Sequence, residues 1–234
     1  MAGVIIALDV PSPEEALALV ERIGEEGRFY KVGLELYTRA GPSVVRELRD
    51  RGRRVFLDLK LHDIPHTVGR AVEAASALGV DLLTVHAAGG PRMLEAARDA
   101  ADPEVRLLAV TVLTSLKPDD MGRVWGRQIR SVREEVGRLA DLAVECGMNG
   151  VVASSLEASW LRSHVGDEFL IVTPGIRLAG TDQGDQRRVA TPADAVRAGA
   201  DYLVVGRAVT HAADPASAFS ALLREVREAE AAGG

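Results

Sequence analysis

The stretch RVFLDLKLHDIPHTVGRAVEAASALG, residues 54–79, shows the repeating unit of the fold, because it joins an apolar run directly to an amphipathic one. Residues 54–61 have the length and hydrophobicity of a buried strand, whereas residues 67–79 place apolar side chains at helical spacing. A strand followed by a helix is the unit from which parallel sheets are built. The rest of the chain repeats this unit.

Seven further apolar runs lie along the 234 residues, and helical patterns separate them. They occupy residues 4–10, 29–36, 82–87, 106–113, 150–154, 169–175 and 202–208, and a last helix starts at about Pro215. Their nearly continuous hydrophobicity indicates strands that are covered on both faces. Eight strand–helix units without a linker predict an α/β protein, a single (β/α)8 TIM barrel over residues 1–234. An open doubly wound sheet is the alternative, but it would normally bring a glycine-rich dinucleotide turn after the first run, and none is there.

The composition narrows the class of partner. Hydrophobic residues make up 47% of the chain and charged residues 26%, as in an ordinary globular protein. The formal net charge is −6 and basic residues form no block, so we expect a small molecule and not a nucleic acid as the partner. The first apolar run is short and no basic region precedes it, which predicts a cytoplasmic protein without a signal peptide or membrane span. Cys146 is the only cysteine, so an intrachain disulfide is excluded.

Polar residues stand at the ends of the predicted strands, where the active site of a (β/α)8 barrel lies. They are Asp9, Lys31, Asp58, Lys60, His86, Thr114, Arg177, Gly206 and Arg207. Asp58 and Lys60 are two residues apart, so they share one face of their strand and can pair inside the barrel mouth, while Leu57, Leu59 and Leu61 take the other face. A structural salt bridge is the simpler interpretation of one such pair. Charges at several strand ends favour a ligand site, because buried charges are costly unless something compensates them.

Asp63 lies three residues beyond Lys60, which is about 10 Å further along an extended chain. It can reach the same cavity only if the loop folds back or another subunit presents it. His62, His66 and His86 are interpreted as ordinary loop or core histidines, without a part in the chemistry.

Lysine is scarce in this chain. Only Lys31, Lys60 and Lys117 are lysines among 28 basic residues, and the other 25 are arginines. Arginine cannot release a proton in a protein, whereas lysine can act as an acid or a base. Two of the three lysines fall on predicted barrel strands, so proton transfer at Lys31 or Lys60 is favoured over simple charge pairing.

The last two units carry a second signal. In barrel enzymes, the loops after strands seven and eight often bind phosphate through backbone N–H groups. The strings PGIR (174–177) and VGRAV (205–209) fall there. Gly206 would allow close approach of the backbone, Arg207 could bind two phosphate oxygens, and Gln186 could add a neutral donor. Together they predict a ligand that carries a phosphate.

These residues resemble the orotidine 5'-phosphate decarboxylase family. The strings ALDV (7–10), KVGLEL (31–36), DLKLHDIPHT (58–67), DQRRVATP (185–192) and VVGRAV (204–209) occur in the family's order, from the first predicted strand to the last. The Asp-x-Lys-x-x-Asp-Ile-Pro string is the most specific of them. The resemblance implies a homodimeric barrel that decarboxylates orotidine 5'-monophosphate to UMP and CO2 without a metal or an organic cofactor.

The resemblance also implies a role for individual residues. Lys60 would donate the proton to C6 of the pyrimidine, and Asp58 would lie beside the substrate carboxylate. Lys31, Asp58 and Lys60 would form an alternating charge array that Asp63 of the other subunit completes. The remaining implied contacts are Asp9 and Lys31 to the ribose, Thr114 to the pyrimidine, Ile64 and Thr67 across the interface, and Arg177, Gln186, Gly206 and Arg207 to the phosphate.

Two alternatives stay open at this point. The related 3-keto-L-gulonate 6-phosphate decarboxylases and hexulose-phosphate synthases use a similar strand but need Mg²⁺ and an acid on strand two. This chain has Lys31 in that strand, and a cation there would repel a divalent metal. The second alternative is a barrel that binds a phosphorylated ligand without chemistry, which would need the phosphate loops but not the Asp/Lys array.

Overall fold

Eight parallel strands close into a barrel in which each strand is hydrogen-bonded to its neighbours in sequence. The structure is a computed structural model, and it describes residues 2–177 and 190–233. The last strand closes the ring by pairing with the first, for example Leu203 with Val4. The strands are β1 (Gly3–Ala7), β2 (Phe29–Gly33), β3 (Arg54–Leu61), β4 (Leu82–His86), β5 (Arg106–Val110), β6 (Gly150–Val152), β7 (Leu170–Ile176) and β8 (Tyr202–Val205). The predicted (β/α)8 barrel is confirmed.

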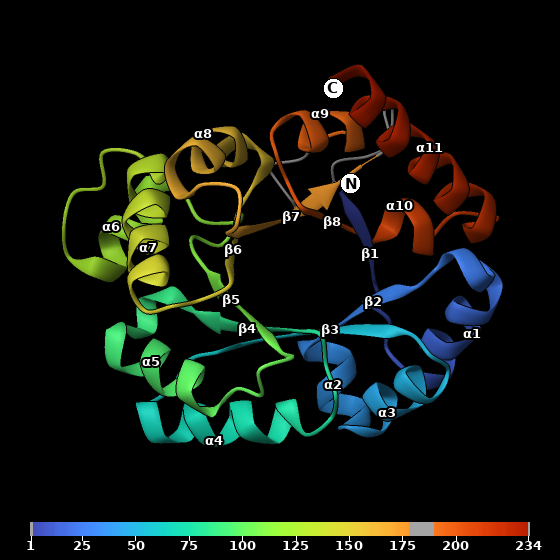
Figure 1. Ribbon diagram of the computed structural model, residues 1–234, viewed down its shortest axis with the longest axis horizontal. Helices are drawn as coiled ribbons and strands as arrows, with labels where there is room; N and C mark the ends of the chain where they lie inside the picture. The colour runs from blue at the N-terminus through green and yellow to red at the C-terminus, as the bar shows by residue number, and fades with distance from the viewer. Residues whose placement is uncertain (1, 178–189, 234) are drawn as a thin grey trace.

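Helices follow every strand and lie outside the ring of strands (Figure 1). The α-helices are α1 (Pro13–Ile23), α2 (Leu34–Ala40), α3 (Ser43–Asp50), α4 (Pro65–Ser76), α5 (Pro91–Ala100), α6 (Pro118–Trp125), α7 (Val132–Glu145), α8 (Ser155–Val165), α9 (Pro192–Arg197), α10 (Arg207–Thr210) and α11 (Pro215–Gly233). Two short 3-10 turns are η1 (Gly24–Glu26) and η2 (Ala87–Gly89). In the part of the chain that the structure describes, no helix has both the length and the apolar character needed to cross a membrane.

Helix starts follow local sequence signals, whereas two strand ends do not. Ser12 caps α1 by accepting a hydrogen bond from the backbone N–H of Glu15, and a proline opens that helix. The apolar run 29–36 is longer than its strand, since β2 ends at Gly33 and α2 begins at the next residue. The run 202–208 is divided in the same way between β8 and α10. Hydrophobicity alone does not separate a buried strand from the helix that follows it.

Inward-facing side chains fill the lower part of the barrel and leave its mouth polar. The interior cluster consists of Ile5, Ala7, Phe29, Phe56, Leu82, Leu108, Val172 and Val204, and a second, larger cluster packs the sheet against the helices. Side chains two positions apart point to the same face of a strand. Lys31, Asp58 and Thr84 each lie two positions beyond an interior residue, so they face inward directly above this apolar plug. The plug therefore becomes the floor of a site.

Candidate active site

A cavity of about 570 Å³ opens at the C-terminal ends of the strands. Its volume is in the range of small-molecule sites. Ala7, Phe56 and Val204 of the interior plug belong to its lining. Eight residues that the sequence predicts for the site also line it, namely Asp9, Lys31, Asp58, Lys60, Thr114, Arg177, Gly206 and Arg207. The fold thus brings most of the predicted set into one cavity.

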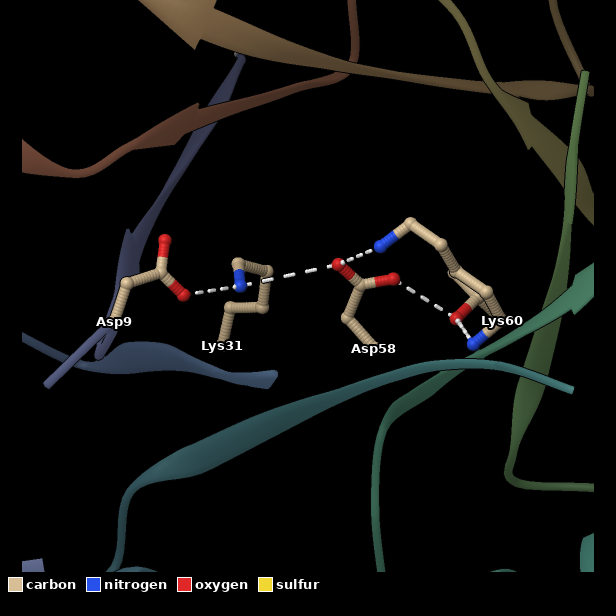
Figure 2. Close-up of polar contacts among 5 residues, drawn as sticks. Asp9, Lys31, Asp58 and Lys60 are labelled. Atoms are coloured by element: carbon tan, nitrogen blue, oxygen red, sulfur yellow. Dashed lines mark hydrogen bonds and ion pairs between the residues drawn. The ribbon is translucent and has the colours of Figure 1, made fainter. Parts of the chain in front are cut away.

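Four charged side chains form a row of alternating sign along one wall of this cavity (Figure 2). Lys31 Nζ donates to Asp9 Oδ1 at 2.8 Å and lies 3.8 Å from Asp58 Oδ2. Lys60 Nζ donates to that same Oδ2 atom of Asp58 at 2.7 Å. The side chain of Asp58 is only 13% exposed, so it is the most shielded carboxylate of the row and stands between two ammonium groups. The predicted pairing of Asp58 with Lys60 is present.

The backbone of β3 leaves regular strand geometry at Lys60. Leu57 pairs with Leu83 and Leu61 pairs with Val85, so four steps along β3 match two steps along β4. The two extra residues form a bulge, and Lys60 has a φ of 49°, the only positive φ of a non-glycine residue among those described. Such a conformation is unfavourable for a lysine and persists only where its surroundings fix it. Alternation of side chains predicted the inward direction of Lys60 but not this distortion.

Thr84 on β4 is a buried polar residue that the sequence interpretation missed. Its hydroxyl accepts a hydrogen bond from the backbone N–H of Lys60 at 2.8 Å and donates one to Asp58 Oδ1 at 2.9 Å. Thr84 is fully buried. The signal that could have found it is a threonine in the run LLTVH, two positions beyond an inward-facing leucine and beside the strand that carries the acid and the lysine.

Gly33 at the end of β2 is a second residue that the interpretation missed. A Cβ at this position would lie 2.9 Å from Lys31 Nζ and 3.3 Å from Asp9 Oδ1. Both distances are shorter than normal contacts, so glycine leaves room for the ion pair between Lys31 and Asp9. The sequence signal was a glycine inside the apolar run 29–36, two positions beyond the lysine.

Two guanidinium groups, those of Arg177 and Arg207, also line the cavity. Arg177, which follows β7, is buried, and its Nη1 atom donates to the carbonyl of Ile176 at 3.0 Å. Burial and the positive charge of Arg207 lower the pKa of Arg177. Two neighbouring cations of this kind would be stabilised by an anion between them. A Cβ on Gly206 would be 3.8 Å from its nearest protein atom, so the protein itself leaves space there. The predicted Gln186 lies outside the described residues.

Asp63, Ile64 and Thr67 do not line the cavity. They lie at the start of α4, and all three are exposed, Ile64 to 65%. The carboxylate of Asp63 accepts a hydrogen bond from the backbone N–H of Ile64 at 2.6 Å. Within one chain, therefore, the third acid of the Asp-x-Lys-x-x-Asp string is separate from the first acid and the lysine.

The ring of His62, directly after β3, stacks on the ring of His86 at the end of β4, with the centroids 5.2 Å apart. Burial, the neighbouring His62 and the charge of Lys60 all lower the pKa of His86. His86 is thus neutral near pH 7, and it adds no charge to the row. Its Nδ1 atom is buried and makes no hydrogen bond to any described residue. No group of three or more His, Cys, Asp or Glu side chains in residues 2–177 and 190–233 has a geometry that could hold a metal ion.

Comparison with known proteins gives matches over nearly the whole chain. The profile of the "Orotidine 5'-phosphate decarboxylase / HUMPS family" matches residues 3–222. Proteins named orotidine 5'-phosphate decarboxylase from Vibrio campbellii and Moorella thermoacetica are each 50% identical to this chain, over 94% and 95% of it and over 95% and 91% of their own lengths. The crystal structure of orotidine 5'-phosphate decarboxylase from Lactobacillus acidophilus superimposes with a TM-score of 0.86 at 38% identity, covering 97% of this chain and 99% of its own. The chain belongs to the orotidine 5'-phosphate decarboxylase / HUMPS family.

Proposed function

We propose that this protein decarboxylates orotidine 5'-monophosphate to UMP and CO2. The observation that carries the proposal is the row of alternating charges. In this row, Asp58 Oδ2 lies 2.7 Å from Lys60 Nζ and 3.8 Å from Lys31 Nζ. A barrel that only bound a phosphorylated ligand would have no need for this row. The names of the relatives at about 50% identity support the same reaction.

The phosphate and the ribose anchor the substrate in this proposal. The guanidinium groups of Arg177 and Arg207 bind the phosphate, and Gly206 and Gln186 are proposed as further phosphate contacts. Asp9 and Lys31 bind the ribose hydroxyls, and Thr114 contacts the pyrimidine. Binding energy from the phosphate end can then be used to hold the reacting ring against the charged row. A substrate with this many charges cannot cross a membrane unaided, which supports a cytoplasmic location.

The chemistry takes place at C6 of the pyrimidine. The bond between C6 and the carboxylate carbon breaks, CO2 leaves, and the electron pair stays on C6, where no conjugated system accepts it. The ammonium group of Lys60 stabilises this charge because Asp58 already holds it in place, at 2.7 Å, before the reaction starts. A proton of Lys60 Nζ then moves to C6 and completes UMP, and Lys60 regains a proton from solvent. Asp58 orients Lys60 and, being anionic, disfavours the bound substrate carboxylate more than the departing CO2.

The Mg²⁺-dependent reactions of related barrels are less well supported. The ammonium group of Lys31 stands between Asp9 and Asp58, 2.8 Å from one carboxylate and 3.8 Å from the other. Those are the carboxylates that a divalent cation at this end of the barrel would need. A cation that is part of the protein already compensates their charge.

The direct test is an absorbance assay that follows the loss of orotidine 5'-monophosphate by the purified protein. We expect turnover, and we expect the same rate after dialysis against EDTA, because the proposed charge stabilisation comes from lysine. Excess Mg²⁺ should not raise the rate. Loss of activity in EDTA with recovery in Mg²⁺ would favour the metal-dependent alternative. UMP binding by calorimetry without any turnover would favour the binding protein.

We extend the proposal to a homodimer in which each site receives Asp63, Ile64 and Thr67 from the partner subunit. Asp63 cannot serve its own cavity in the conformation described, because it does not line it. Ile64 presents a large apolar side chain to solvent, and so does Leu34, which is 55% exposed at the cavity rim. Burial of these side chains against a second copy would be favourable.

Gly33→Ala is expected to lower kcat/KM roughly tenfold or more, because it removes the charge-assisted contact between Lys31 and Asp9. The new methyl group would displace the Lys31 ammonium, which is the flexible end of its side chain. The fold should therefore tolerate the change, with less than about 1 kcal/mol of difference in the free energy of unfolding. Steady-state kinetics and thermal unfolding measure the two effects. An unchanged kcat/KM would mean that the contact between Lys31 and Asp9 does not matter for the reaction.

A further inference from the structure

We infer that Thr84 is a positioning residue for the reaction, and that it holds Asp58 and Lys60 in their reactive arrangement through its single hydroxyl group. The inference rests on the proposed function. Among the described residues, Thr84 makes no hydrogen bond to either ammonium group of the charged row, yet its hydroxyl contacts the backbone of Lys60 at 2.8 Å and the carboxylate of Asp58 at 2.9 Å.

The bulge in β3 creates the need for this hydroxyl. Three residues, 58 to 60, lie opposite Thr84 alone, so the regular ladder between β3 and β4 is interrupted there. The N–H of Lys60 bonds to the Thr84 side chain in place of a backbone carbonyl. A buried N–H without a partner is unfavourable. The threonine therefore stabilises the positive φ that turns Lys60 into the cavity.

The same hydroxyl divides the two oxygens of Asp58 between different partners. The hydroxyl donates a hydrogen bond to Oδ1, whereas Oδ2 accepts a hydrogen bond from Lys60 Nζ and lies 3.8 Å from Lys31 Nζ. The backbone N–H of Lys60 can only donate and the ionised carboxylate of Asp58 can only accept, so the direction of both bonds is determined. Rotation of the carboxylate would break the bond to Thr84. The oxygen that neighbours both ammonium groups is thus fixed, and with it the place of the Lys60 Nζ atom.

Three variants test the inference. Thr84→Val keeps the shape and removes the hydroxyl, Thr84→Ser keeps the hydroxyl and removes the methyl group, and Thr173→Val is the matched control. Thr173 is also a fully buried barrel threonine, but its hydroxyl makes no hydrogen bond to any described residue. Decarboxylation kinetics, UMP affinity and crystal structures are compared with the wild type.

For Thr84→Val we expect kcat to fall about 10- to 100-fold while UMP affinity changes less than about threefold, because the phosphate and ribose contacts are untouched. Thr84→Ser should recover kcat to within a few-fold of the wild type, and Thr173→Val should match the wild type. The structure of Thr84→Val should show a rotated Asp58 carboxylate and a changed φ at Lys60.

A kcat for Thr84→Val within threefold of the wild type, or a Thr84→Ser variant as slow as the valine variant, would overturn the inference. So would a Thr84→Val structure in which Asp58 and Lys60 are unmoved. If the wild type does not decarboxylate orotidine 5'-monophosphate, the proposed function fails. The structures then still decide whether Thr84 positions these two side chains.

Discussion

Replacing Lys60 with alanine is expected to lower kcat for orotidine 5'-monophosphate by at least about 10⁴-fold, which combines a lost proton donor with lost electrostatic stabilisation. In this variant no ammonium group lies against the C6 carbanion. Lys31 is the nearest other ammonium, but its Nζ is bonded to Asp9 at 2.8 Å. UMP affinity should stay measurable, because the phosphate and ribose contacts come from other strands. Absorbance kinetics and calorimetry measure the two quantities.

The matched control for this variant is Lys60→Arg. Arginine keeps a positive charge near Asp58 but cannot release a proton. If proton transfer matters as proposed, the arginine variant should bind UMP and should be nearly as slow as the alanine variant. If charge alone is enough, the arginine variant should retain substantial activity. Substantial turnover by the alanine variant would contradict the assignment of Lys60 altogether.

The sequence predicted those features that depend on local patterns. Runs of apolar residues separated by helical patterns predicted the barrel, and alternation along residues 54–61 predicted that Asp58 and Lys60 face inward together. The barrel follows from a repeat of strand and helix patterns along the chain. The shared inward direction follows from the two-residue spacing within one strand. The Asp58 and Lys60 atoms are indeed in contact at 2.7 Å.

The features that the sequence did not predict depend on contacts between strands. The bulge at Lys60 arises because β3 has three residues between its paired positions Leu57 and Leu61, whereas β4 has only Thr84 between the partners of these two residues. No property of residues 54–61 alone specifies that difference. The role of the Thr84 hydroxyl in the hydrogen-bond network follows from this register. Likewise, Gly33 was interpreted as part of a strand, whereas its importance comes from the space that the neighbouring Lys31 and Asp9 side chains need. The apolar pattern of one strand does not show how much room the neighbouring side chains need.

Asp63 also shows where the sequence is ambiguous. Its spacing in the Asp-x-Lys-x-x-Asp string allows two interpretations, a loop that folds back or a residue given to a partner. In the described chain the loop does not fold back, and Asp63 bonds to the neighbouring Ile64 N–H at 2.6 Å. This geometry favours the second interpretation.

Asp63→Ala is therefore expected to lower kcat by roughly 10²- to 10³-fold, because in the proposed dimer each site would lose the partner's carboxylate that completes the charge array. The decisive measurement combines this variant with Lys60→Ala in one dimer. The two chains are coexpressed with different affinity tags, and the heterodimer is purified through both tags. If the site is shared, one barrel lacks Lys60 and also receives no Asp63, whereas the other barrel has both. The heterodimer should then regain about half of the wild-type activity, since one of the two sites of a twofold dimer is intact.

The control heterodimer pairs Lys60→Ala with Asp58→Asn, which are both residues of the same barrel wall. Asp58 and Lys60 line the cavity of their own chain, so each of the two sites in this heterodimer is damaged and activity should not return. Recovery in the first pair and none in the second requires that Asp63 acts across the interface. If Asp63 acted within its own chain, both heterodimers would stay inactive, because every site would then carry one substitution. Because the two pairs share the Lys60→Ala chain, the difference between them reports only on which barrel Asp63 completes.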